Sequence, residues 1–394
     1  MSRRKLISLI LVLMLGAYPL AYSLAPDVSS QDTAADSAPR YASFAEYQQA
    51  TRQYLLLHRH FQTADHEAEL EWNSPQEWRP ASVARKGILL VHRLGDSPWS
   101  FSDLGPALAK QGFLVRTMLL PGHGTQPADL IPVDLEDWRR ALRDQVKLMQ
   151  RDVPRVYLGG FSTGGNLTTE YALEHPEIAG LLLVSPAFKS KSAFDWLTPW
   201  LSHIRPWLRS ENGPRPQQTA LRYLNTPTNG FAQFYRSSYA VRQLLDREHY
   251  DKPVVIAVTE HDSVLDVRYI LQTFNQRFTN PQSRLIWYGR LPEDSPASPR
   301  VLVKTDYLPE QRISQFSHMG MLFAPDNRQY GVDGKQRLCW NGQSAPQMQR
   351  CLAGDPVWYS DWGYTEANKV HARLTFNPYF AWQESVIAAT LGGR

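Results

Sequence analysis

The chain has 394 residues, of which 43% are hydrophobic and 20% are charged, so it can bury a large core and is not a mainly disordered protein. Its 42 Lys and Arg residues nearly balance 38 Asp and Glu residues. The basic residues cluster only at Arg3, Arg4 and Lys5, so the sequence gives no indication of a nucleic-acid partner.

The N-terminus has the pattern of an export or membrane segment. The three basic residues precede an uncharged stretch, 6–25, which as a helix is long enough to span a bilayer. Ala21–Ser23 would suit cleavage of a signal peptide, and an uncleaved membrane anchor is the alternative. Either way the rest of the chain lies outside the cytoplasm. We therefore expect a periplasmic protein, or one held in the inner membrane by this segment.

The rest of the chain predicts a linker, 26–40, and one domain, 41–394. The domain opens with a helical stretch at 41–64 and a strand at Glu67–Trp72. From residue 86, continuous apolar runs alternate with helical segments, which predicts a mostly parallel, doubly wound α/β sheet covered on both faces. The strands are expected at Gly87–Val91, Phe113–Leu119, Val156–Gly159, Gly180–Val184 and Val254–Val258, and the helices at Phe101–Lys110, Leu135–Arg151 and Gly165–Glu174.

The alternation breaks in an aromatic-rich insertion, about 188–250. An insertion that follows a strand end predicts a helical cap over the site, and a structural excursion that packs elsewhere is the alternative. Trp196, Trp200 and Trp207 recur at spacings that would place them on one helical face, although two prolines interrupt that helix. We expect these tryptophans to bind an apolar part of the substrate.

The strongest motif is Gly160–Gly164, which reads G-x-S-x-G between an expected strand and an expected helix. That context makes the motif specific, because a tight strand-to-helix turn exposes the serine hydroxyl and tolerates only small neighbours. We expect Ser162 to be a nucleophile and Phe161 to lie at the substrate site. A purely structural turn is the alternative.

A serine hydroxyl needs a base, and the base needs an acid that orients it. Asp262 follows the expected strand Val254–Val258 and would reach the same sheet edge as the serine; Asp266 and Glu260 are the alternatives. His318, in a loop after the last strands, is the expected base. The chain order serine, aspartate, histidine is that of the α/β-hydrolases.

The oxyanion formed in acyl transfer needs backbone donors. One is expected from Thr163, beside the nucleophile at a helix start. The other is expected from Leu94, in the loop after the strand Gly87–Val91.

These motifs resemble the α/β-hydrolase superfamily, and within it the branch of monoglyceride lipases, carboxylesterases and serine aminopeptidases. The resemblance covers about residues 86–323 and implies a Ser-His-Asp hydrolase. Arg93 departs from it, because the family usually has Gly there. A backbone donor survives that change, and the Arg93 side chain either faces an anionic substrate group or lies at the surface. The matching pieces are His92 with its loop, Pro121–Gly124, Gly160–Gly164, Asp262 and Ser317–Met319.

The remaining histidines predict no metal site. His58, His60 and His66 do not have the spacing of a common metal site and fit a solvated helix face. His92 and His123 are expected to hold loops near the site by hydrogen bonds. No nucleotide-binding or zinc-binding motif is present, so the sequence implies no cofactor.

Two cysteines, Cys339 and Cys351, flank a short polar loop in a long irregular region, about 324–363. In an oxidising compartment they would form a disulfide, and two unpaired buried thiols are the alternative.

We therefore expect a cofactor-free serine hydrolase acting on small or lipid-like carboxylic esters, such as a carboxylesterase, monoglyceride lipase or lysophospholipase. A peptidase or amidase is the alternative enzyme, because the same triad cleaves amides. A catalytically silent envelope-binding protein is the alternative outside catalysis.

Overall fold

The computed structural model describes residues 39–211, 213 and 215–392. The expected signal peptide or anchor, 1–25, lies outside the described residues, as does nearly all of the expected linker. Within the described part of the chain, no helix is both long and apolar enough to cross a membrane.

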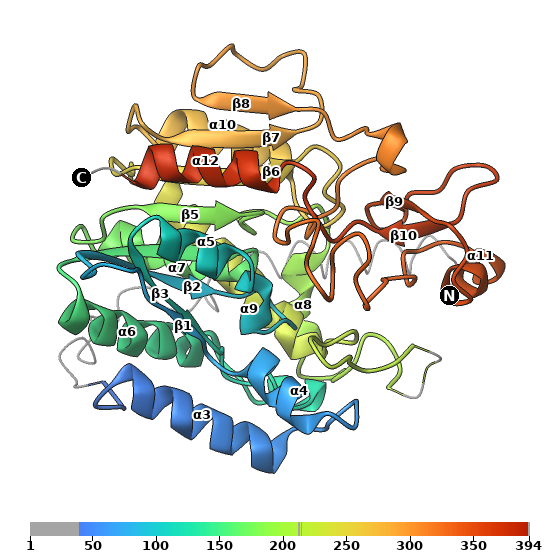
Figure 1. Ribbon diagram of the computed structural model, residues 1–394, viewed down its shortest axis with the longest axis horizontal. Helices are drawn as coiled ribbons and strands as arrows, with labels where there is room; N and C mark the ends of the chain where they lie inside the picture. The colour runs from blue at the N-terminus through green and yellow to red at the C-terminus, as the bar shows by residue number, and fades with distance from the viewer. Residues whose placement is uncertain (1–38, 212, 214, 393–394) are drawn as a thin grey trace, which may run out of the picture. The chain divides into compact units, whose positions relative to one another are not determined.

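An eight-stranded sheet forms the centre of the fold, in the order β1-β3-β2-β4-β5-β6-β7-β8 (Figure 1). All neighbouring pairs are parallel except the edge pair β1–β3. The chain runs from β2 to β3 on one side and then crosses to β4 on the other side of β2, so the ends of β2 and β4 form the switch point where such folds place their sites. The strands are β1 (Glu77–Trp78), β2 (Lys86–Val91), β3 (Phe113–Met118), β4 (Arg155–Phe161), β5 (Leu181–Val184), β6 (Val254–Thr259), β7 (Arg284–Tyr288) and β8 (Val301–Lys304).

Helices cover both faces of this sheet, and each face has its own apolar core. Residues of α6, α7 and α10 pack in one core, and residues of α5 and α12 pack in the other. The sheet is therefore buried on both sides, which explains its continuous apolar strands. The helices are α3 (Phe44–His58), α4 (His66–Asn73), α5 (Leu104–Lys110), α6 (Leu135–Asp152), α7 (Thr163–Glu174), α10 (Val267–Arg277) and α12 (Phe380–Leu391).

The doubly wound α/β fold is confirmed, and the five strands expected after residue 86 are present with ends shifted by one or two residues. The strand expected at Glu67–Trp72 is wrong, because these residues lie in α4. The Asp65 side chain caps that helix by accepting a hydrogen bond from the Ala68 N–H at 3.0 Å. Two glutamates in the first turn also favour the helix, because they face its positive end.

Between β5 and β6 the chain forms the short helices η3 (Asp195–Leu197) and α8 (Thr198–Leu201) and the long helix α9 (Thr228–Leu245). The three tryptophans do not share one helix. Trp196 lies in η3, Trp200 in α8, and Trp207 beyond the end of α8. Proline occupies the first turn of α8. It can begin a helix, but because it has no N–H it cannot continue a helix that comes from the preceding residues.

The C-terminal region is more regular than expected. It contains α11 (Ala345–Leu352) and a small parallel sheet of β9 (Trp358–Ser360) and β10 (His371–Arg373). Cys339 and Cys351 form a disulfide, with Cys351 on α11. In the chain-entropy model, closing so short a loop stabilises the fold by about 3 kcal/mol.

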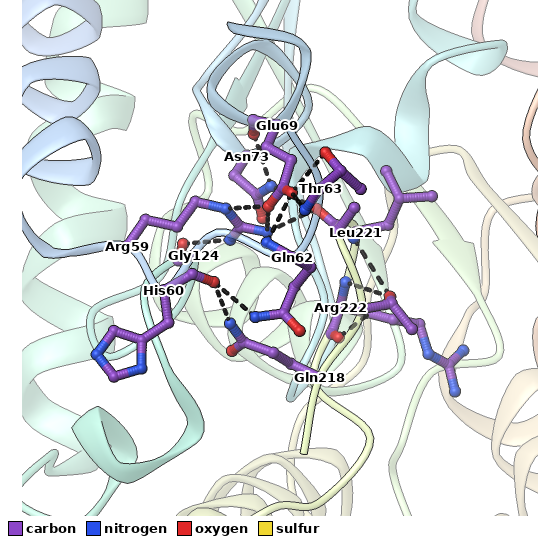
Figure 2. A network of polar contacts seen from close by, with 12 residues as sticks. Arg59, His60, Gln62, Thr63, Glu69, Asn73, Gly124, Gln218, Leu221 and Arg222 are labelled. Carbon is purple, nitrogen blue, oxygen red and sulfur yellow. Dashed lines mark hydrogen bonds and ion pairs between the residues drawn. The ribbon is translucent and has the colours of Figure 1, made fainter. Parts of the chain in front are cut away.

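A buried ion pair joins the N-terminal helices to the segment between β5 and β6, about residues 188–250, which is the expected cap (Figure 2). The guanidinium of Arg59 donates to Glu69 at 2.9 Å and to the carbonyl oxygens of Gly124 at 2.5 Å and Ala220 at 2.7 Å. Both charged side chains are at most 1% exposed. The second carboxylate oxygen of Glu69 accepts from the N–H groups of Gln62 and Thr63, so neither charge lacks partners.

Removing one charge of this pair should be costly. We expect Glu69→Gln to lower the free energy of unfolding by about 3–5 kcal/mol, because the buried Arg59 loses its counter-charge. The matched control is Glu67→Gln, which removes an exposed partner of Arg52 and should change stability by less than about 1 kcal/mol. Urea denaturation measures both. Equal effects of the two substitutions would contradict the structural role given to Arg59.

Candidate active site

Ser162 occupies a sharp turn between the end of β4 and the start of α7. Its backbone has a positive φ of 54°, which is strained for a residue with a side chain. The flanking glycines are required by space, because a Cβ on Gly160 would collide with the backbone of Gly164, and one on Gly164 with the carbonyl of Val91. The turn therefore has the strained, glycine-flanked backbone that the motif predicted, whereas Ser162 itself is buried and only 3% exposed.

His318 and Asp262 form a buried hydrogen-bonded pair at the same edge of the sheet. Nδ1 of His318 lies 2.7 Å from Oδ2 of Asp262. The other carboxylate oxygen accepts from the N–H groups of Val264 at 2.8 Å and Leu265 at 3.0 Å. Since Nδ1 is engaged, Nε2 is the ring nitrogen of His318 that remains for proton exchange.

The end of β5 holds the serine and histidine segments together. The N–H of Ser162 donates to the carbonyl of Val184 at 3.0 Å, and the Ser185 hydroxyl donates to the carbonyl of His318 at 3.0 Å. The ring of Phe161 lies 5.2 Å from the ring of His318. Among the described residues no hydrogen bond links the Ser162 hydroxyl to His318; in unliganded enzymes such contacts often tighten only with substrate.

Two backbone donors are free beside this turn. Thr163 is the first residue of α7, and Leu94 lies in the loop after β2. Within residues 39–211, 213 and 215–392, neither N–H has a hydrogen-bond partner. Both can therefore donate to an oxyanion.

Two buried histidines hold the Leu94 loop, as expected. Nδ1 of His92 lies 2.8 Å from the carbonyl of Arg93, and its Nε2 accepts from the Leu120 N–H at 3.1 Å. His123 accepts from the Gly95 N–H at 2.9 Å. Burial lowers the pKa of His92 to about 4 and that of His123 to about 3, so both rings are neutral near pH 7 and act as structural bridges.

The two alternative acids have other contacts. Glu260 accepts from the N–H of Arg290 at 2.6 Å. Asp266 caps α10, accepts from the N–H of Tyr269 at 3.1 Å, and pairs with Lys189 at 2.9 Å. The geometry therefore favours Asp262 as the partner of the histidine.

The expected substrate-binding side chains lie at different depths. Phe161 is fully buried in the core, whereas Trp196 and Trp200 are 53% and 65% exposed. Trp207 is half-buried. Arg93 is partly buried: its side chain is 20% exposed, pairs with Asp96 at 2.8 Å and lies 5.5 Å from the Phe161 ring centre. Contact of any of these side chains with substrate remains a prediction.

A possible metal-ligand set lies next to Asp262. Glu260, His261 and Asp306 bring one ligand atom each within 4.8 Å of one another. His261 is already hydrogen-bonded to Asp306 at 2.5 Å, a contact that raises the pKa of this imidazole. Asp306 also accepts from the N–H of Phe316 at 3.4 Å, so the group ties the Asp262 loop to the His318 loop.

Sequence reasoning missed two residues at the site. Asp361, after β9, accepts from the N–H of Ser263 at 2.5 Å, and burial followed by the charge of Asp262 raises its pKa. Arg222, from the cap, donates to the sulfur of Met319 at 3.1 Å. Neither residue belongs to a motif, so no local signal marks them.

Residues 82–291 match the family model described as "Serine aminopeptidase, S33". The chain belongs to this serine hydrolase family. The matched part of this hydrolase includes Ser162 and Asp262 and ends before His318.

Individual proteins resemble this serine hydrolase over about half of its length. A thermostable monoacylglycerol lipase of Bacillus sp. (strain H-257) is 29% identical over 45% of this chain and 71% of its own. A carboxylesterase of Bacillus subtilis (strain 168) is 23% identical over 52% of this chain and 82% of its own. The structure of a soluble variant of monoglyceride lipase from Saccharomyces cerevisiae is 15% identical, with a TM-score of 0.43 over 59% of this chain and 80% of its own.

Proposed function

We propose that this hydrolase cleaves carboxylic esters through Ser162, His318 and Asp262. The observation that carries the proposal is the buried His318–Asp262 pair, 2.7 Å apart, at the sheet edge where the strained Ser162 turn lies. A base oriented by an acid at the same sheet edge as a serine is the arrangement that nucleophilic acyl transfer requires.

In this mechanism Ser162 Oγ attacks the ester carbonyl, and Nε2 of His318 takes its proton. Asp262 holds Nδ1–H and stabilises the imidazolium that forms. The N–H groups of Leu94 and Thr163 stabilise the oxyanion of the tetrahedral intermediate. Collapse of the intermediate breaks the bond to the alcohol, which leaves with the proton from His318.

Water completes the cycle by the same groups. His318 removes a proton from water, the resulting hydroxide attacks the acyl-enzyme, and the proton returns to the oxygen of Ser162 as the acid leaves. Every step uses side chains or backbone groups of this chain.

The proposed substrates are esters with an apolar acyl group. Two similar proteins are named as a monoacylglycerol lipase and a carboxylesterase, which supports ester chemistry. Exposed Trp196 and Trp200 on the cap support an apolar binding surface, together with Trp207. Burying an acyl chain there would contribute about 0.8 kcal/mol per methylene.

The proposed location is outside the cytoplasm, in the periplasm or at the inner membrane. The basic and apolar pattern of residues 1–25 and the disulfide between Cys339 and Cys351 support it.

A panel of p-nitrophenyl esters and aminoacyl anilides, tested on the purified protein, separates the candidate activities. We expect the kcat/KM for the esters to exceed that for the anilides, because an aminopeptidase would need acidic side chains on the cap for the substrate amine, and the cap side chains placed near this site are Arg215 and Arg222. Preferential cleavage of the anilides would show that the amidase alternative is correct. If neither class turns over and a fluorophosphonate does not label Ser162, the protein is not a serine hydrolase in function.

A further inference from the structure

Two arginines from separate parts of the chain, Arg93 and Arg222, lie beside the proposed active site, and two more, Arg215 and Arg373, act on them electrostatically. Arg93 comes from the loop that carries Leu94, Arg215 and Arg222 come from the cap, and Arg373 is the last residue of β10. No sequence motif groups them, and the proposed ester hydrolysis uses none of their charges.

Arg222 is the most unusual of the four, because it is buried without a counter-ion. The residue is 6% exposed, and its guanidinium donates to the sulfur of Met319, the neighbour of His318, at 3.1 Å. Its buried Nε has no hydrogen-bond partner. Within the described part of the chain, no carboxylate lies within ion-pairing distance of this side chain. A buried charge with no partner is costly, which indicates a group that binds there during function.

The backbone around Arg222 is fixed by the polar network of Figure 2. The hydroxyl of Thr219 accepts from the N–H groups of Leu221 at 3.3 Å and Arg222 at 3.2 Å. The carbonyl of Ala220 accepts from Arg59 at 2.7 Å. The guanidinium of Arg222 points away from this network, so the anchored backbone presents it to the His318 side.

The positive fields of the four arginines act on one another. Burial and the positive fields of Arg222, Arg93 and Arg215 lower the pKa of Arg373 to about 9. Burial and the fields of Arg209, Arg222 and Arg93 lower the pKa of Arg215 to about 10.

The nearby acids do not balance this charge. Asp96 is paired with Arg93, and Asp361 attracts Arg373 while its own pKa is raised by burial and by Asp262. The arginine cluster therefore has an excess of positive charge beside the reacting centre.

We propose that Arg222 and Arg93, in the positive field of Arg215 and Arg373, bind an anionic oxygen group, a carboxylate or a phosphate, carried by the ester substrate. The proposal rests on the proposed function, whose substrate class it narrows to anionic esters. Guanidinium groups suit this task, because their planar donors match the oxygens of carboxylates and phosphates. Arg222 contacts Met319, the neighbour of His318, and Arg93 lies over Phe161, the neighbour of Ser162. The anionic group of a substrate bound at these arginines would therefore lie close to its ester bond at Ser162.

The first test compares pairs of substrates in which one member carries an added anionic group. One pair is p-nitrophenyl valerate and mono-p-nitrophenyl glutarate, which places the anion on the acyl side. The other is a monoacylglycerol and its 3-phosphate, which places the anion on the alcohol side. In at least one pair we expect the anionic member to have the higher kcat/KM, and Arg222→Gln to reduce the anionic-to-neutral ratio at least about tenfold.

The matched control is Arg247→Gln, which removes an exposed cap arginine and should keep the ratio of the parent protein. The proposal is overturned if the neutral members of both pairs are preferred or equal. It is equally overturned if Arg222→Gln leaves the ratio unchanged while the esters are still hydrolysed; in both cases the proposed ester hydrolysis stands.

A second test does not depend on catalysis. Inorganic phosphate or glutarate should raise the Tm of the parent protein above its value in chloride at equal ionic strength, and should raise the Tm of Arg222→Gln less. The Tm of each variant without anion also reports whether it folds. If anions raise the Tm through Arg222 but the protein hydrolyses no ester, the anion site stands and the proposed ester hydrolysis is refuted. Stabilisation without any substrate preference would show that the bound anion is not part of the substrate, which overturns the proposal.

Discussion

Replacing Ser162 with alanine is expected to lower the kcat/KM for esters by at least about 10³-fold. The loss follows because the variant has no nucleophile, whereas binding and the oxyanion donors remain. Steady-state kinetics with a p-nitrophenyl ester measures the effect, and circular dichroism verifies the fold. Labelling of the parent protein with a fluorophosphonate should modify the peptide that contains Ser162.

The matched control is Ser82→Ala, which removes an exposed hydroxyl well before the motif in the chain. It should retain both the activity and the labelling of the parent protein. Activity near that of the parent in Ser162→Ala would remove Ser162 from the mechanism, whatever the substrate.

Replacing Asp262 with asparagine is expected to lower kcat by about 10⁴-fold, the size of effect known for the equivalent change in a serine protease triad. The amide cannot stabilise the imidazolium, and its NH₂ group can hold His318 in the wrong tautomer. The matched control is Asp266→Asn, which keeps a good capping residue on α10 and should change kcat little. A larger loss of kcat in Asp266→Asn would show that the acid lies four residues further along the chain.

Local sequence patterns predicted the centre of the fold well. The strands of the sheet are apolar on both faces, and the serine turn combines a strand end, small neighbours and a helix start. These signals need only a few consecutive residues. The sequence order also placed Asp262 and His318 at one sheet edge, and the structure brings their side chains to 2.7 Å.

The remaining features depend on contacts between distant residues. The Arg222–Met319 contact spans 97 positions, and the Asp361–Ser263 contact spans 98. No spacing rule connects such residues before the fold is known. The error at α4 has a different cause: the length and apolar content of residues 67–72 suit either element, and the capping Asp65 and two glutamates in the first turn favour the helix.

The bonds between the N-terminal helices and the cap also bear on how such enzymes diversify. Arg59 and Asn73 both donate to the carbonyl of Ala220, and Gln218 donates to the carbonyl of His60. Gln218 and Ala220 lie within the cap segment, whereas Arg59, His60 and Asn73 lie before the start of the family match at residue 82. The cap segment and the α3–α4 region are therefore held together by these hydrogen bonds. A chimaera that takes its cap from a relative would have to take these helices with it, or their donors would face a backbone that they no longer fit.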